Sequence, residues 1–501
     1  MKALKVRFSR EVLNRMVPAL ICAGLGGAIF RLCWALKEMD IGMLLFYLSV
    51  PKDPVANYSV VFSTALQCLL FAAAAVLVVL LLLHFLSARR QRAAGSAKRR
   101  LRLFGRYAYK RIVAFCCVGL LVGSVVTLAC AVELPQYLAA ADETTTIYED
   151  AYVDPAAQQY RFPEKKRNLI HIYMESMETT CMDGAHGGQW AENVLPGLSA
   201  LAAENPSFTG FHAVSGMDWT IGALVAQTSG LPLTLPLTLG GQEEDSGAFL
   251  PGACTMGDIL ADAGYRQVFL CGSDAGFAGR ADYFSQHGGY RVWDYNTAIA
   301  TGRIPEDYYE FWGFEDAKLY DYAKDQLLEL AAGDRPFNLT MLTVDTHFYD
   351  GYLCPLCGDG FDSQYENVLA CADCQVTAFL QWLQTQDFYE DTTVVITGDH
   401  LCMDDDFYSL RGADKADRRI YSCFLNAYGG QRDCEKDREL CALDIFPTTL
   451  SAMGVTWDGS RLGLGVSLFS GEPTLTETYG AQGLGAELQK KSDYYVQHFL
   501  D

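Results

Sequence analysis

The chain has 501 residues, too many for one compact hydrophobic core, and its 39 Lys and Arg against 60 Asp and Glu give a net charge of −21. The charge is divided unevenly, because residues 1–111 carry 18 basic and 4 acidic side chains whereas residues 112–501 carry 21 and 56. A basic front therefore precedes a strongly acidic body, and this acidic body argues against nucleic acid as a partner.

Three apolar stretches in the basic front are candidates for transmembrane helices. They cover residues 16–36, 60–86 and 112–134, and the second and third are long enough to cross a bilayer. The segment 87–111 carries ten Lys and Arg and no acidic residue, so we expect it to stay in the cytoplasm together with the N-terminus. Residues 1–134 are thus predicted to form a multi-pass anchor in the cell membrane, with the rest of the chain on the extracellular or periplasmic side.

Residues 135–165 are polar and mixed, and we predict that they form a linker to an outer domain made of residues 166–501. In that domain short apolar runs alternate with helical patterns. The predicted strands are 168–174, 266–270, 337–344 and 392–397, and the predicted helices include 256–263, 317–332 and 371–384. This alternation predicts an α/β fold with a mainly parallel sheet flanked by helices.

Carboxylates and histidines follow the predicted strands. Glu175 follows the first strand, Asp274 the second, His347 the third, and the pair Asp399 and His400 the fourth. In open α/β sheets, ligands bind beyond the carboxyl ends of the strands. We therefore expect a single site at that edge, although each residue taken alone is more simply explained as a solvated loop side chain.

Thr220 stands between a short turn that contains Gly216 and a run of small and apolar residues that predicts a buried helix. Its hydroxyl would lie in the first helical turn, where backbone N–H groups and the helix dipole can hold a phosphate. Taken alone, such a threonine is more often an N-cap. With Glu175, Asp399 and His400 it completes a set of hard ligands that suits Mn²⁺, Mg²⁺ or Zn²⁺, and a metal ion would turn the hydroxyl into a nucleophile.

Four sequence blocks carry a resemblance to a known family. They are residues 168–176, Gly216-x-x-Trp219-Thr220-Ile221, Thr343-x-Asp345-Thr346-His347 and Gly398-Asp399-His400. In order and spacing these blocks resemble the phosphoglycerol transferase and lipoteichoic acid synthase family, which has the alkaline phosphatase and sulfatase-like fold. The resemblance covers roughly residues 165–470.

The resemblance implies a metal-dependent phosphotransferase. Thr220 would be both the nucleophile and a metal ligand, and Glu175, Asp399 and His400 would complete the metal site, which holds manganese in lipoteichoic acid synthase. Thr220 is followed by Ile-Gly-Ala-Leu, which departs from the C/S-x-P-x-R signature of type I sulfatases, so no formylglycine can form here.

The resemblance also implies two residues that bind substrate. Arg280 would bind the phosphoglycerol group, because a guanidinium matches phosphate geometry, and His347 would contact the phosphate or protonate the leaving group. Without the family resemblance, other roles are equally good explanations for these two residues. Arg280 would form a surface salt bridge, and His347 would be a loop residue whose ring bonds a backbone carbonyl.

The implied activity is transfer of glycerophosphate from phosphatidylglycerol, or a similar membrane lipid, to a glycan or a glycerophosphate polymer through a phospho-threonine intermediate. Two alternatives stay open within enzymes: a phosphoethanolamine transferase and a phosphodiesterase of the same superfamily. A third alternative is a non-catalytic membrane sensor with this fold.

Of the 17 cysteines, 11 lie after residue 135. The spacing of Cys354-x-x-Cys357 and Cys371-x-x-Cys374 indicates a zinc ribbon inside a cell but disulfides outside it. Because the domain is expected outside the cell, we favour disulfides, which would hold the loop after His347 in place over the entrance to the site.

Overall fold

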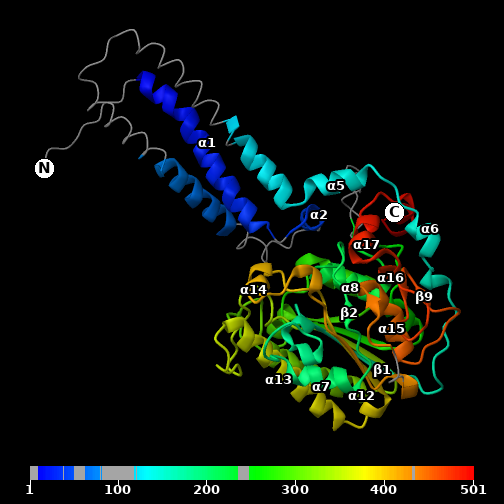
Figure 1. The fold of residues 1–501 in the computed structure, drawn as a ribbon. Coiled ribbons are helices and arrows are strands. Elements are labelled where there is room, and N and C mark those ends of the chain that lie inside the picture. Colours follow the sequence, from blue (N-terminus) through cyan, green and yellow to red (C-terminus); the bar gives the residue numbers. More distant parts are fainter. Residues whose placement is uncertain are drawn as a thin grey trace, which may run out of the picture. The chain divides into compact units, whose positions relative to one another are not determined.

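The computed structural model describes residues 10–37, 39–49, 63–78, 81, 118–119, 121–234, 248–430 and 435–500. The chain divides into two compact units (Figure 1). One consists of Met1–Leu48 with Lys52–Ala139, and the other of Ser49–Pro51 with Ala140–Asp501.

Apolar helices make up the described part of the first unit. They include α1 (Arg10–Ala35), α2 (Ile41–Ser49), Ser63–Val78, Leu121–Ala131 and α5 (Leu134–Ala141). Within the described ranges, no single helix has both the length and the apolar character of a membrane span. Leu121–Ala131 and α5 meet that criterion only as a pair, which is bent by 64° at the break between them.

The predicted membrane topology is therefore only partly covered by the structure. The expected spans 60–86 and 112–134 extend beyond the described residues, and the basic segment 87–111 lies wholly outside them.

A six-stranded sheet with the order β4-β3-β5-β1-β6-β7 forms the centre of the second unit. Its strands are β1 (Asn168–Met174), β3 (Arg266–Cys271), β4 (Arg291–Trp293), β5 (Phe337–Leu342), β6 (Thr392–Gly398) and β7 (Ser422–Leu425). All neighbouring strands run parallel except β6 and β7. The predicted parallel sheet is thus confirmed, and the two strands that were not predicted, β4 and β7, are its short edges, where three or four residues show too little periodicity.

Two small two-stranded sheets lie outside the central one. One pairs β2 (Gly210–Phe211) with β8 (Glu439–Leu440), and the other pairs β9 (Arg461–Leu462) with β10 (Gly465–Val466).

Helices cover both faces of the central sheet (Figure 1). On one face lie α7 (Pro196–Glu204), α12 (Asp316–Ala331) and α13 (Gln364–Gln384); on the other lie α8 (Thr220–Ser229), α9 (Met256–Asp262), α10 (Arg280–Gln286) and α15 (Ile445–Ala452). The remaining α-helices described in this unit are α6 (Ile147–Ala151), α11 (Tyr295–Ala300), α14 (Asp405–Ser409), α16 (Leu475–Tyr479), α17 (Ala481–Leu488) and α18 (Asp493–Tyr495).

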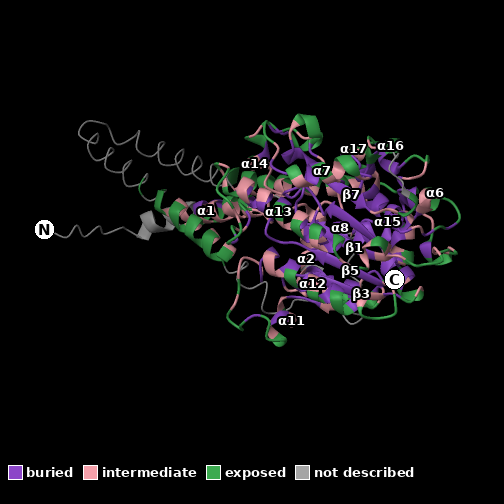
Figure 2. Ribbon diagram, turned by 90° about the horizontal axis from the view of Figure 1, so that it is seen from below, coloured by how far each residue is buried: buried purple, intermediate pink, exposed green. Residues whose placement is uncertain are grey.

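The strands are buried on both faces, as the purple ribbons of Figure 2 show. Successive residues of a strand point to opposite faces. Ile170 and Ile172 of β1 accordingly join the apolar core that includes α7, α12 and α13. His171 points to the α8 face, where its Nε2 lies 3.1 Å from the hydroxyl of Thr397. This second face is more polar and leads to the site.

Helix α13 begins at Gln364, seven residues before the predicted start at residue 371. The reason is a capping signal, because the Ser363 side chain accepts the N–H of Glu366 and satisfies a free donor of the first turn. The predicted helix 256–263 differs from α9 by one residue at its end, and 317–332 differs from α12 by one residue at each end.

Candidate functional site

The carboxyl ends of β1 and β6 lie in register, since Met174 pairs with Gly398. The next residues along the two strands are Glu175 on one side and Asp399 with His400 on the other. All three side chains are buried, with exposed fractions of 2%, 0% and 1%. One ligand atom of each lies within 4.8 Å of those of the other two, so the structure brings together the three residues expected from their strand-end positions.

Helix α8 brings Thr220 to this cluster. A turn at Gly216, whose φ of 83° favours glycine, precedes it, and Thr220 is the first residue of the helix. Every later residue of α8 is buried, whereas Thr220 is half-buried. Its Oγ1 lies 3.3 Å from Nε2 of His400.

Gln227 fixes α8 to the end of β6. Its Nε2 donates to the carbonyl of Gly398 over 3.1 Å, and its Oε1 accepts the hydroxyl of Thr397 over 2.8 Å. These two bonds are buried, and they tie the helix that carries Thr220 to the strand that leads to His400.

The protonation of His400 follows from its partners. Its Nδ1 lies 2.7 Å from the carbonyl oxygen of Leu401, which can only accept, so Nδ1 carries a proton and Nε2 is the nitrogen that faces the site. That Nε2 is 3.5 Å from Oε1 of Glu175 and 3.4 Å from Oδ2 of Asp399. Burial lowers the pKa of His400, but the two carboxylates outweigh it and raise this pKa above its ordinary value.

Asp399 shows why a cation fits here. Burial first, and then the charge of Glu175, raises the pKa of Asp399 to about 7. Its Oδ1 accepts the N–H groups of Ser176 and His400, each over 2.8 Å, whereas its buried Oδ2 has no hydrogen-bond partner among the described residues. Two crowded carboxylates and an imidazole lone pair form a hard donor set that suits Mn²⁺, Mg²⁺ or Zn²⁺.

Ser176 holds the two carboxylates in place, a role that the sequence analysis missed. Its N–H donates to Asp399, and its hydroxyl donates to Oε1 of Glu175 over 2.9 Å. Its φ of 54° lies in the left-handed region, which is uncommon for a residue other than glycine and is found where surrounding contacts demand it. The only sequence signal for this role is its position directly after a strand-end carboxylate.

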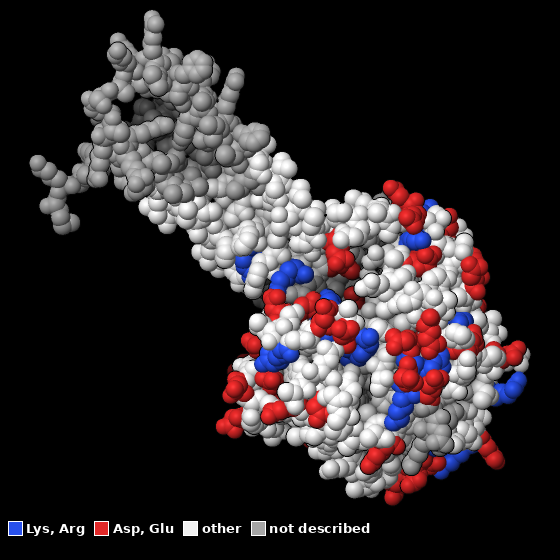
Figure 3. Space-filling view, viewed as in Figure 1, with Lys and Arg blue, Asp and Glu red and all other residues white. Residues whose placement is uncertain are grey.

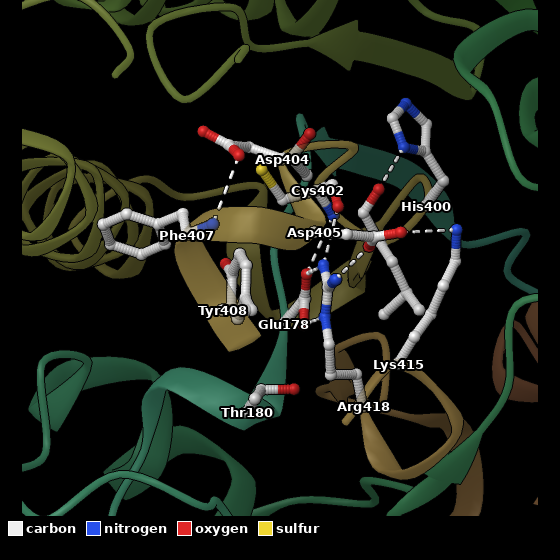
Figure 4. A network of polar contacts seen from close by, with 12 residues as sticks. Glu178, Thr180, His400, Cys402, Asp404, Asp405, Phe407, Tyr408, Lys415 and Arg418 are labelled. Atoms are coloured by element: carbon white, nitrogen blue, oxygen red, sulfur yellow. Dashed lines mark hydrogen bonds and ion pairs between the residues drawn. The ribbon is translucent and has the colours of Figure 1, made fainter. Parts of the chain in front are cut away.

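A buried ion pair fixes the segment after His400 (Figure 4). The side chains of Arg418 and Glu178 are 0% exposed, with Nη2 at 2.5 Å from Oε1 and Nε at 3.0 Å from Oε2. Glu178 also accepts the N–H of Cys402, and Arg418 donates to the carbonyl of the same residue. The pair thus joins the loop after Glu175 to the loop after His400.

Arg280 is 5% exposed and begins α10. Its Nη2 donates to the hydroxyl of Ser273 over 3.1 Å and to the carbonyl of Asp274 over 2.7 Å, and its Nε donates to the carbonyl of Phe277 over 3.1 Å. It forms no ion pair within the described part of the chain, so the alternative of a surface salt bridge finds no support. The guanidinium is instead held by the loop that follows β3.

His347 follows β5, and its ring packs between Trp312 and Phe348, with centroid distances of 4.8 Å and 4.7 Å. Nδ1 donates to the carbonyl of Phe348 over 2.7 Å, which leaves Nε2 as an acceptor. Burial lowers the pKa of His347 to about 4, and the nearby charges of His400 and Arg280 act in the same direction. His347 is therefore a neutral imidazole within electrostatic reach of the cluster and of Arg280.

Asp345, from the same motif as His347, lies outside the cluster. Its Oδ1 accepts the N–H of Asp316 over 3.1 Å, and the Asp316 carboxylate accepts the N–H groups of Val344 and Asp345. These reciprocal bonds shape the turn that leads from β5 to His347.

The cysteines depart from the predicted pairing. Within the described residues no disulfide joins Cys354, Cys357, Cys371 and Cys374, all of which are thiols. The first three form one group, whereas Cys374 is exposed and lies outside it. The fold brings three sulfur atoms together, and disulfides would require them in pairs.

Much of the chain is similar in sequence to known proteins. Residues 167–455 match the sulfatase family. Phosphoglycerol transferase I of Xanthomonas euvesicatoria is 33% identical over 275 residues, which cover 52% of this chain and 38% of the relative. Phosphoglycerol transferase I of Escherichia coli is 30% identical over 321 residues, which cover 62% of this chain and 40% of the relative. Each of these alignments thus spans well under half of the relative's length.

Solved structures of similar fold include the lipoteichoic acid synthase LtaP from Listeria monocytogenes. The TM-score is 0.47 at 18% identity, and the match covers 65% of this chain and 81% of that one.

Proposed function

Since residues 167–455 place the protein in the sulfatase family, we propose that it is a membrane-anchored, metal-dependent phosphoglycerol transferase. The observation that carries this proposal is the position of Thr220, whose Oγ1 lies 3.3 Å from His400 Nε2 beside a buried Glu-Asp-His cluster. The identity to phosphoglycerol transferases supports the reaction class.

In the proposed first step, Thr220 Oγ attacks the phosphorus of phosphatidylglycerol or a similar membrane lipid. The bond from phosphorus to the diacylglycerol oxygen breaks, that oxygen takes up a proton, and glycerophosphate remains esterified to Thr220. In the second step, a hydroxyl of a glycan or glycerophosphate polymer attacks the same phosphorus and restores the Thr220 hydroxyl. Dividing the transfer into two displacements lets one nucleophile serve both substrates.

Four side chains would hold the metal ion, namely Glu175, Thr220, Asp399 and His400. The ion, Mn²⁺ with Mg²⁺ or Zn²⁺ as alternatives, would supply positive charge that favours the Thr220 alkoxide and the phosphate oxygens. The N–H groups at the start of α8 add further positive potential at the same point.

Arg280 and His347 are assigned to the substrate. The guanidinium is planar and pre-positioned by three hydrogen bonds, which suits the fixed geometry of a phosphate. His347 presents Nε2 and would contact the phosphate or the leaving oxygen. We assign residues 1–134 to the membrane anchor, 135–165 to the linker and 166–501 to the outer catalytic domain, which keeps the site near its lipid donor.

A donor assay tests this function. The purified full chain is supplied with Mn²⁺, a glycan acceptor, and vesicles of either phosphatidylglycerol or phosphatidylethanolamine. We expect diacylglycerol release and labelled glycerophosphate on the acceptor only with phosphatidylglycerol. Transfer from phosphatidylethanolamine would identify a phosphoethanolamine transferase. Release of free glycerophosphate without transfer to the acceptor would identify a phosphodiesterase. A protein that neither binds the metal ion nor turns over either lipid would be a non-catalytic sensor.

A further inference from the structure

The group of three sulfur atoms has no part in the proposed transfer. Two of them come from the turn Cys354-Pro355-Leu356-Cys357, which is closed by the N–H of Cys357 donating to the carbonyl of Cys354 over 3.0 Å. The third comes from Cys371, on the buried face of α13. Cys354 and Cys371 are buried, and Cys357 is half-buried.

The distances between the sulfur atoms match a metal-bound set. Sγ of Cys354 lies 3.7 Å from Sγ of Cys371 and 3.8 Å from Sγ of Cys357, and all three lie within 4.8 Å of one another. Tetrahedral zinc with Zn–S bonds of about 2.3 Å requires neighbouring sulfur atoms about 3.8 Å apart. A disulfide requires about 2.05 Å and would leave the third sulfur without a bonded partner.

One amide side chain lies beside two of the sulfur atoms. Nε2 of Gln375 lies 3.3 Å from Sγ of Cys371 and 3.8 Å from Sγ of Cys354, so one amide group points its N–H bonds at both sulfur atoms. Such donors stabilise the negative charge of metal-bound sulfur. The donor set contains only sulfur, which favours zinc over the manganese or magnesium that suits the Glu175 cluster.

Cys374 is the candidate for a fourth ligand. It follows Cys371 by three residues on α13, and residues at this spacing share one helix face with their Cβ atoms about 5–6 Å apart. It is exposed and lies outside the group of three, so zinc binding would have to bring its sulfur into the fourth tetrahedral position.

We propose that Cys354, Cys357 and Cys371 bind one zinc ion through their thiolates, with Cys374 as the fourth ligand, at a site separate from the Glu175-Asp399-His400 cluster. The ion ties the loop that begins at His347 to α13. Metal binding releases the thiol protons and transfers no electrons.

The bound ion acts on a loop that hydrogen bonds and ring contacts also hold to the fold. The N–H of Tyr352 donates to the carbonyl of Asp345 over 2.7 Å, its hydroxyl donates to Glu310 over 3.1 Å, and its ring stacks on Phe311. Zinc would fix the middle of the same loop and so help to position His347. The zinc site does not depend on the identity of the lipid donor.

Cobalt substitution tests the site in the purified full chain. The protein is stripped with a chelator under reducing conditions and titrated with Co²⁺. We expect an ultraviolet thiolate-to-cobalt charge-transfer band that saturates at one equivalent, because the Glu175 cluster contains no sulfur and cannot produce this band. X-ray absorption of the zinc-loaded protein should show sulfur neighbours at about 2.3 Å.

Matched variants assign the ligands. Cys357→Ser should weaken zinc binding by about 100-fold or more, whereas Cys254→Ser, at another half-buried cysteine outside the group, should leave it unchanged. Cys374→Ser should weaken binding and shift the cobalt spectrum. Absence of the band in the wild type, or a disulfide between any two of the three clustered cysteines in the protein as isolated, would overturn the proposal.

Discussion

The Glu175-Asp399-His400 cluster and the Cys354-Cys357-Cys371 cluster differ in chemistry and in the parts of the fold that hold them. The first has oxygen and nitrogen donors at the ends of two hydrogen-bonded parallel strands. The second has sulfur donors contributed by a loop turn and by a helix. Hard and soft donors differ in the metal ions that they prefer, so the sulfur set favours zinc more strongly than the Glu175 cluster does.

The two clusters also differ in what makes them rigid. The strand register and the buried Glu178–Arg418 pair position the first cluster before any metal ion binds. The second cluster takes two of its sulfur atoms from the middle of an irregular loop, so there the metal ion itself would supply much of the order. Acidic side chains spread over the visible face of the second unit (Figure 3), so the overall charge of this surface favours cations in general and does not distinguish the sites.

The largest expected effect is at Thr220. Thr220→Ala removes the proposed nucleophile, so transfer should fall by roughly 10³-fold or more. Thr220→Ser keeps a hydroxyl at the same place and should retain a measurable part of the activity. Both variants should leave the cobalt–thiolate band unchanged. Near-normal diacylglycerol release by the alanine variant would mean that Thr220 only caps the helix and is not the nucleophile.

Asp399→Asn tests whether the two clusters bind metal ions independently of each other. Losing a buried carboxylate should weaken Mn²⁺ binding and lower transfer by about 100-fold or more, because the remaining ligands carry less negative charge. The same variant should bind Co²⁺ at the cysteines as the wild type does. Loss of both signals together would mean that the two regions are not independent.

The buried ion pair should matter for stability more than a surface pair. Arg418→Met leaves the Glu178 charge buried and unpaired, so the free energy of unfolding should fall by about 3–5 kcal/mol. The matched control is Arg303→Met, which breaks the exposed pair with Asp325 and should cost at most about 1 kcal/mol. Urea unfolding of both variants checks this, and equal losses would contradict the account of the first cluster.

The smallest effect concerns pH at the turn that leads to His347. Burial raises the pKa of Asp345 to about 9 and that of Asp316 to about 7. Both pKa values exceed that of an aspartate in the unfolded chain, so the folded state holds these protons more tightly and stability should fall as the pH rises from about 4 through about 9. Asp345→Asn should make the thermal stability of the protein depend less on pH between pH 6 and pH 9. An unchanged dependence on pH would contradict the assignment of these protons to Asp345 and Asp316.

The parts of the fold that could be predicted are those encoded locally. The apolar run 168–174 corresponds to β1 residue for residue. Because parallel strand ends share an edge, the sequence placed Glu175, Asp399 and His400 at one edge, but the same reasoning included Asp274, which is not part of the cluster. The short edges β4 and β7 lack such runs.

Contacts between distant segments could not be predicted in the same way. The grouping of Cys371 with Cys354 depends on which face of α13 meets the loop, and spacing within each motif does not contain that information. The role of Ser176 likewise depends on a bond to Asp399, which lies 223 positions away in the sequence.

The central claim is that Thr220 carries the transferred group, and mass spectrometry of the peptide that contains it is the most direct test. The wild-type protein is incubated with phosphatidylglycerol and Mn²⁺ without acceptor, quenched in acid and digested. We predict a glycerophosphate adduct on Thr220 that disappears when acceptor is added and is absent from Thr220→Ala. An unmodified Thr220 peptide alongside continued diacylglycerol release would contradict the claim.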